Sequence, residues 1–185
     1  GAGVPASNMN PQYGESVTVT IDDDPDRTLV SLLVNGQDVT AQVVNGKYII
    51  NNVTGDVTIE ATFKSTKEFI TMTGDYATFS CPQDLNFTGS NLRAYIASGF
   101  NKNTNQVLLV RVYDVPAGTG VFLVGEPGTT YKVPYSETSS YYVNLFQPNL
   151  QRNTIYATAG NYSNYTFGEQ DGDPGFYPIN GRTTL

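Results

Sequence analysis

The stretch "TLVSLLVNGQDVT" (residues 28–40) indicates how this chain folds. A run of β-branched and leucine residues ends at the dipeptide Asn35-Gly36, and a second run, "DVTAQVV", follows it. Asn-Gly is the strongest short-range hairpin signal, because both residues tolerate the positive φ that a tight turn needs. The same dipeptide recurs at Asn45-Gly46, ahead of "KYIINNV". We therefore expect consecutive hairpins in this part of the chain.

Apolar and polar residues alternate with period two on both sides of this stretch. "SVTVTI" (residues 16–21) precedes it and "DVTIEATF" (residues 56–63) follows it, which gives five short β-rich runs in all. Alternate residues of a strand share one face. The apolar positions that share a face are Val17, Val19 and Ile21, and again Val57, Ile59, Ala61 and Phe63. One face of this small sheet is predicted to be a core.

The polar stretch "KSTKE" (residues 64–68) interrupts the pattern, and beyond it the loops are longer and Tyr and Pro are denser. Strands are expected where β-rich runs lie between turn clusters. These runs are "YATFSC", "LRAYIAS", "QVLLVRVY", "GVFLVG", "TIYATA", "NYTFG" and "GFYPI". The fully apolar "VLLV" (residues 107–110) predicts a central strand that is buried on both faces.

The expected fold class is therefore all-β, with two β domains in tandem. We assign residues 1–13 to an irregular leader, 14–64 to a small β domain, 65–68 to a linker and 69–185 to a larger β-sandwich or barrel. The first residues resemble neither a signal peptide nor a natural start, which favours an excised or mature piece of a longer protein. No window of about 18 apolar residues exists, so no transmembrane segment is expected.

Composition argues against several classes of function. The net charge is −7 and no block of Lys or Arg occurs, which disfavours nucleic acid as a partner. The chain has no His, so it lacks the commonest general base and zinc ligand. Cys81 is the single cysteine, and we interpret it as a small buried apolar group rather than a nucleophile. We expect no enzyme activity, catalytic residue or cofactor.

Two acidic clusters are candidates for calcium sites. "IDDDPDR" (residues 21–27) can be aligned with an EF-hand loop that starts at Asp22, but Arg27 stands where Gly is needed and Leu33 where a bidentate Glu is needed. Pro and Asp are turn formers, so a strand-connecting turn is the better interpretation. The cluster of Glu169, Asp171 and Asp173 also favours a turn ahead of a strand. We assign no metal site.

Tyrosine is the one enriched residue type with a functional interpretation, at 13 Tyr against no Trp. Exposed Tyr rings suit stacking on sugars or a protein interface, although Tyr in strands more often packs across strands or covers the edge of a core. The candidate binding residues are Tyr135, Tyr141, Tyr142, Tyr162 and Tyr165, and the loop "SETSSYY" is the best part of this set.

Residues 14–64 resemble a divergent internalin-type B repeat of bacterial surface proteins, a β-grasp-like module. The residues that carry this resemblance are Gly14, "LLVNGQDVT" and "DVTIEATF". Residues 75–179 resemble a C-terminal β domain of Bacteroidetes-type surface proteins, often attached to leucine-rich repeats. The matching pieces are "DYATFSCPQDLNFTG", "LRAYIASG", "VLLVRVYDVPAGTGVFLVGEPGTTYKVP" and "GDPGFYPING".

This resemblance implies an extracellular or cell-surface location and no transferable catalytic residues. The expected function is a non-catalytic stalk or spacer that supports adhesion or ligand binding by neighbouring domains of a longer bacterial protein. The alternative is a binding module whose Tyr-rich loops hold a glycan or a host protein. Coplanar, exposed Tyr rings in one groove would favour the second function over the first.

Overall fold

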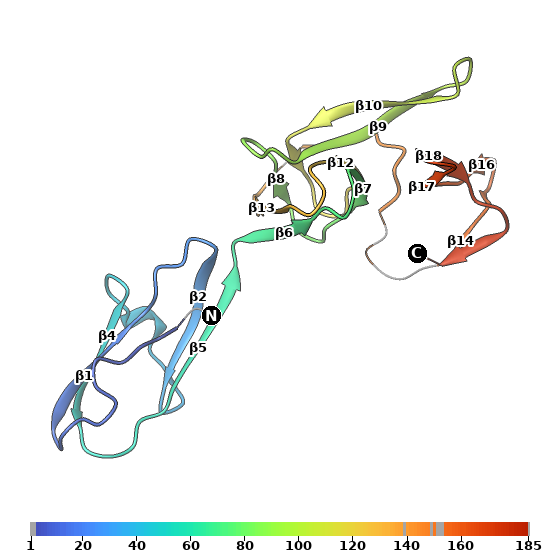
Figure 1. The fold of residues 1–185 in the computed structure, drawn as a ribbon. Helices are drawn as coiled ribbons and strands as arrows, with labels where there is room; N and C mark the ends of the chain where they lie inside the picture. Colours follow the sequence, from blue (N-terminus) through green and yellow to red (C-terminus); the bar gives the residue numbers. More distant parts are fainter. Residues whose placement is uncertain (1–2, 139, 149, 151–153, 185) are drawn as a thin grey trace. The chain divides into compact units, whose positions relative to one another are not determined.

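The structure, a computed structural model, describes residues 3–138, 140–148, 150 and 154–184, and some side chains after Asn161 lie outside that description. These residues form antiparallel strands and one short 3-10 helix, so the predicted all-β class is confirmed. The chain divides into two compact units, Gly1–Lys67 and Glu68–Leu185, which are described separately (Figure 1).

The first unit contains two small sheets. β1 (Glu15–Thr20) pairs with β4 (Lys47–Val53), and β2 (Arg27–Val34) lies between β3 (Gln37–Asp38) and β5 (Ile59–Ser65). Val19, Leu32, Val34 and Val39 form the buried core of the unit, and Val57, Ile59 and Ala61 pack against it as the alternation predicts. This burial stabilises the unit because apolar surface is removed from water.

The two Asn-Gly turns have the predicted backbone. Asn35 and Gly36 have φ of 51° and 75°, and Asn45 and Gly46 have φ of 50° and 70°. Positive φ at both central residues gives a turn whose twist matches that of the flanking strands. Local turn chemistry therefore sets the register of β2 on β3 and starts β4.

The expected strand over "DVTAQVV" (residues 38–44) is wrong beyond its first residue, Asp38. β3 ends at Asp38, and the 3-10 helix Thr40–Gln42 follows. Asp38 Oδ1 accepts a hydrogen bond from the Thr40 backbone N–H at 2.9 Å, and the Thr40 hydroxyl in turn accepts one from Leu32 N–H at 2.8 Å. Side-chain bonds of this kind compete with a ladder, so they end the strand.

Residues 3–13, the described part of the segment predicted as an irregular leader, contain no strand of their own, but some of them pair with β1. Ser7 N–H donates to Thr18 O at 2.9 Å, Thr20 N–H donates to Pro5 O at 3.0 Å, and Ala6 forms a bridge with Val19. Residues 5–7 therefore cover one edge of β1 within the first unit.

The second unit is built on a four-stranded antiparallel sheet in the order β10-β9-β12-β7. Its strands are β7 (Tyr76–Phe79), β9 (Arg93–Asn101), β10 (Gln106–Val112) and β12 (Val121–Val124). The remaining strands form pairs, and none of the sheets made by the described residues closes into a barrel. The sandwich-like alternative is therefore the one that fits.

These remaining strands pair as hairpins or short ladders. β6 (Lys67–Thr71) pairs with β13 (Thr130–Pro134), β8 (Leu85–Asn86) with β11 (Asp114–Val115), β14 (Thr154–Tyr156) with β19 (Arg182–Thr184), β15 (Thr158–Ala159) with β16 (Tyr162–Ser163), and β17 (Tyr165–Gln170) with β18 (Asp173–Pro178). β6 was not predicted, and it occupies part of the expected linker 65–68.

One face of the four-stranded sheet covers the main core, in which Leu85, Phe87, Leu92, Leu123 and Val133 are almost fully buried. The other face holds an aromatic cluster. The Phe122 ring lies 5.0 Å from that of Phe167 and 5.8 Å from that of Phe176, measured between centroids. Edge-to-face and tilted pairs at these distances are favourable, so the cluster attaches the β17–β18 hairpin to the sheet.

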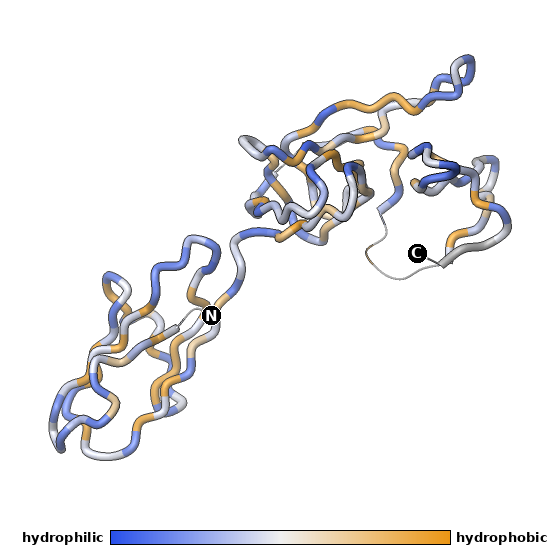
Figure 2. Tube along the Cα trace, in the orientation of Figure 1, coloured by the Kyte–Doolittle hydropathy of each residue, from blue (hydrophilic) through white to orange (hydrophobic). Residues whose placement is uncertain are grey.

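The prediction that "VLLV" is a central strand is wrong. β10 is the outer strand of the sheet, and Leu108 and Val110 each keep 48% of their surface exposed. β12 is the strand buried on both faces, because Leu123 faces the main core and Phe122 faces the aromatic cluster. Figure 2 shows the apolar stretch along β10.

Candidate functional site

The aspartates of residues 22–26 lie in the connection between β1 and β2, and most are engaged by the chain itself. Asp22 Oδ2 accepts a hydrogen bond from Gly3 N–H at 3.0 Å, and Asp24 Oδ1 accepts one from Asp26 N–H at 2.9 Å. Asp26 Oδ1 lies 2.7 Å from Lys67 Nζ. The predicted strand-connecting turn is confirmed, because the segment from Ile21 to Asp26 joins the two strands.

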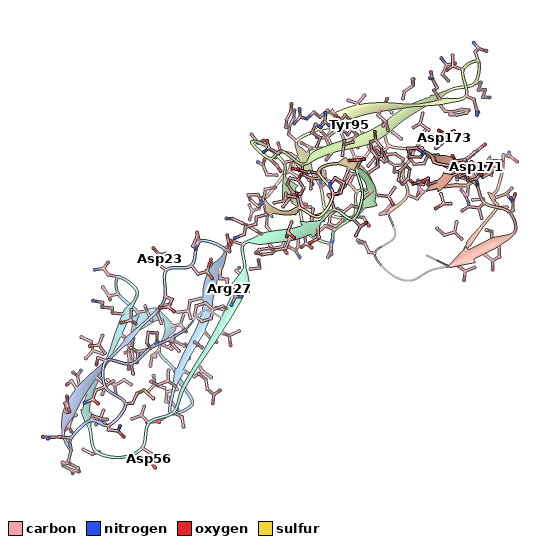
Figure 3. All side chains as sticks on the ribbon, viewed as in Figure 1. Asp23, Arg27, Asp56, Tyr95, Asp171 and Asp173 are labelled. Carbon is pink, nitrogen blue, oxygen red and sulfur yellow. The ribbon has the colours of Figure 1, made fainter. Side chains whose placement is uncertain are left out.

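The same turn holds the end of the first unit. Thr66 N–H donates to Asp26 O at 3.0 Å, and the Thr66 hydroxyl donates to Pro25 O at 3.1 Å. Together with the Asp26–Lys67 ion pair, these bonds fix the chain where it leaves β5. Figure 3 labels Asp23 and Arg27 at this turn. Two backbone carbonyls and the Asp26 carboxylate of the turn hold Thr66 and Lys67, so these groups are not an open set of cation ligands.

The second acidic cluster is a two-residue hairpin turn. Asp171 and Gly172 have φ of 53° and 87°, and Gln170 pairs with Asp173 across the turn. Figure 3 shows Asp171 and Asp173 at the end of this hairpin. Among the residues that the structure describes, no group of three or more Cys, Asp or Glu side chains could hold a metal ion.

Two of the candidate binding tyrosines, Tyr135 and Tyr142, pack against the main core. The Tyr135 hydroxyl donates to Glu68 Oε2 at 2.7 Å, and the Tyr142 hydroxyl donates to Asp114 O at 2.8 Å. Both rings lie against the buried residues of the second unit. The bond to Glu68, helped by burial, raises the pKa of Tyr135 to about 12. These two side chains stabilise the fold at the edge of the core.

Two others project into solvent. Tyr141 is 87% exposed and Tyr165 is 51% exposed. Tyr162 lies in β16, and its side chain is outside the described part of the structure. The four described rings therefore divide between two environments, and Tyr141 differs in this respect from its neighbour Tyr142.

Cys81 is 5% exposed and belongs to the main core, in agreement with its interpretation as a small apolar group. Burial raises the pKa of its thiol, and the nearby Glu68 carboxylate adds to that effect. A raised pKa lowers the thiolate fraction, which is the nucleophilic form.

Asp84 was not singled out from the sequence, although it organises two loops. Its Oδ1 accepts a hydrogen bond from Ala117 N–H at 2.6 Å, and its Oδ2 accepts one from Thr138 N–H at 3.1 Å. These bonds hold the pKa of the carboxyl below its usual value of 3.8. The two donors are 33 and 54 residues away in sequence, so no local pattern signals them.

Asn144 is a second such residue. Its Oδ1 accepts hydrogen bonds from Ala97 N–H at 3.0 Å and Phe146 N–H at 3.1 Å, and its Nδ2 donates to Gly120 O at 2.7 Å. A Cβ at Gly120 would lie 3.1 Å from Phe146 Cβ, so glycine permits this close approach. Asn144 thus fastens an otherwise irregular segment beside β9.

The first unit also has an open groove lined mainly by polar and small apolar residues. It lies between the leader and the loop that precedes β5, with Val17, Ile50 and Ile59 among its lining residues. Asp56 is the single charged residue among those that line it. A pair of carboxylates for acid–base hydrolysis is therefore not assembled there.

Comparison with models of protein families, with curated proteins and with solved structures finds no match to this chain. Within its described residues, the chain contains no helix with the length and apolar character required to span a bilayer.

Proposed function

We propose that this chain is a non-catalytic spacer of a secreted or cell-surface bacterial protein, which supports adhesion or ligand binding by neighbouring domains. The resemblance of its two halves to a B repeat and to a surface-protein β domain supports this role. A spacer requires modules that fold around their own cores and a connection with little slack.

The main structural support for this proposal is the shortness of the connection between β5 and β6. β5 ends at Ser65 and β6 begins at Lys67, so Thr66 alone lies outside a strand. The Thr66 backbone N–H and the Thr66 hydroxyl both donate hydrogen bonds to carbonyl oxygens of the turn between β1 and β2. A flexible tether of several residues would instead let the two units move independently.

The test compares the rotational correlation times of the two units by ¹⁵N relaxation. The two units of the native chain are expected to tumble with closely similar correlation times. A variant with six Gly/Ser residues inserted between Thr66 and Lys67 should give clearly separated values, and the same insertion in the hairpin turn at Gly172 serves as the control. If the native chain already gives values as separate as the linker insertion, the spacer proposal fails.

A second candidate function is binding of a glycan or host protein by the Tyr-rich loops. The observation in its favour is the 87% exposure of Tyr141, which leaves a flat ring with a polar tip available for stacking. A glycan array followed by titration would test it, with Tyr141→Ala as the variant and Val143→Ala as the matched control. A hit that Tyr141→Ala does not weaken would exclude this loop, and the absence of hits would favour the spacer role.

A further inference from the structure

The outer strand of the four-stranded sheet has an uncovered backbone edge. Within the described residues, β10 pairs with β9 and with no other strand. An edge strand presents unpaired N–H and C=O groups, and these are a template for another strand. Figure 1 shows β10 on the outside of the sheet, and β9 lies between it and β12.

The side chains along this edge are apolar and exposed. Leu108, Leu109 and Val110 are exposed by 48%, 38% and 48%, and Phe100, which lies on the paired strand opposite Val107, is exposed by 43%. Native edges are normally protected by charged residues, Pro or very short length. β10 is seven residues long, and Arg111 is its single charged residue. Leu108 and Val110 lie on one face of β10 and Leu109 on the other, so exposed apolar side chains flank the free backbone edge on both faces of the strand.

The charge of this hairpin selects the partner. Residues 93–113 include Arg93, Lys102 and Arg111 and no Asp or Glu, in a chain with net charge −7. None of the three cations has an ion pair within the described residues. Lys102 follows β9 at the hairpin turn, and Arg111 is near the other end of β10, stacked on Tyr113 at 4.8 Å. Two unpaired cations therefore flank the exposed apolar stretch.

We propose that the free edge of β10 is a docking site for an extended strand of a partner polypeptide, with apolar residues at its centre and Asp or Glu at its ends. The backbone edge would supply main-chain hydrogen bonds, Leu108, Leu109 and Val110 would supply apolar contact, and the flanking cations would favour acidic ends. A second copy of this chain satisfies the same backbone groups but brings the same cationic hairpin, so it is the less complementary occupant. Docking at this edge does not depend on the spacer role.

The probe is a fluorescent ten-residue peptide, Glu-Glu-Val-Thr-Val-Ile-Val-Thr-Glu-Glu. The full 185-residue chain is added to it, and binding is measured by fluorescence polarisation. NMR of the chain with the peptide locates the residues that respond. We expect saturable binding with shifts confined to β9 and β10, and weaker binding as salt rises. Val110→Lys should reduce affinity at least tenfold, whereas Val143→Lys, a substitution at another exposed apolar position, should leave it unchanged. A twin peptide with Lys in place of every Glu should bind at least tenfold more weakly.

Backbone pairing has its own readout, which uses the native protein and so avoids any folding defect of a variant. Two versions of the peptide are made. In one, N-methyl groups block the amides along one edge of the extended peptide, and in the other they block the amides along the opposite edge. One version should lose binding and the other should keep it. Equal binding of both versions, equal binding of the Lys twin, or no binding of the acidic peptide would each overturn the proposal. Concentration-dependent dimerisation that Val110→Lys abolishes would assign the edge to a second copy and would also overturn it.

Discussion

Lys67 Nζ lies 2.7 Å from Asp26 Oδ1, and the two side chains are only 26% and 15% exposed. This pair joins the turn after β1 to the last residues of the first unit, which are 41 residues further along the chain. Partly buried pairs are held more firmly than surface pairs, because water screens them less. The acidic turn is therefore asymmetric, with Asp26 engaged and Asp23 left facing solvent.

This asymmetry predicts different effects of neutralising two neighbouring aspartates. Asp26→Asn should destabilise the first unit by about 1–2 kcal/mol, because it leaves Lys67 partly buried without its ion-pair partner. Asp23→Asn should be neutral or slightly stabilising, since it removes repulsion among clustered carboxylates. Urea denaturation of the two variants provides the comparison. Equal effects would show that the Asp26–Lys67 pair contributes nothing.

Replacing the glycine of the first Asn-Gly turn should destabilise the first unit through backbone strain alone, with no steric clash. Gly36 has φ of 75°, and a Cβ added there would meet no atom within 4 Å, so Gly36→Val is strained by its backbone alone. The expected loss is on the order of 1–3 kcal/mol in the first unit. Gly55→Val is the control, because Gly55 also has open space but does not have positive φ. Equal losses in the two variants would contradict this cause.

Asp84 predicts an acid-dependent contribution to the second unit. Its pKa is lower when folded, so its carboxylate stabilises the fold above its usual pKa of 3.8, and this stabilisation is lost as pH falls through the folded pKa. Asp84→Asn should therefore be less stable than the native chain at pH 7, and the difference should shrink below pH 3.8. Unfolding midpoints measured from pH 7 to pH 2 test this. Asp171→Asn, in an exposed turn, is the control, and a difference that stays constant with pH would refute the role.

Tyr135 predicts the opposite pH dependence. Because its pKa rises to about 12, the bond to Glu68 stabilises the protein below the usual value of 10 and is lost as pH rises through about 12. Tyr135→Phe should cost about 1.5–3 kcal/mol at pH 7, the range for a hydrogen bond to a charged group. That cost should decrease between pH 10 and 12. Tyr141→Phe should change nothing, since Tyr141 is 87% exposed.

The sequence predicts the local features of this fold better than the long-range ones. The turns at Asn35-Gly36 and Asn45-Gly46 are correct because their backbone is determined by adjacent residues. The runs "VLLV" and "VFLV" look alike, yet β10 is an exposed edge and β12 is buried on both faces. Their difference depends on strand order, and strand order is set by contacts between distant segments.

The candidate site shows the same division. The interpretation of Cys81 as buried and of the two acidic clusters as turns rests on neighbouring residues, and the structure agrees. Tyr141 and Tyr142 share one loop and one composition, so sequence could not assign one ring to solvent and the other to the core. The contacts of Asp26 with Thr66 and Lys67 were also not predicted, because these two residues are far along the chain from Asp26.

The Asn144 side chain makes three hydrogen bonds to backbone groups, so its removal should destabilise the second unit. Asn144→Ala would leave Ala97 N–H and Gly120 O without their partners, and Ala97 is 1% exposed. An unsatisfied buried group costs about 1–3 kcal/mol, so the second unit should lose on the order of 2–4 kcal/mol. Hydrogen exchange at the Ala97 amide should accelerate more than at amides of β12. Val143→Ala, at a 73% exposed position, should stay within about 0.5 kcal/mol of the native chain. If both variants unfold at the native midpoint, Asn144 does not fasten this segment to β9.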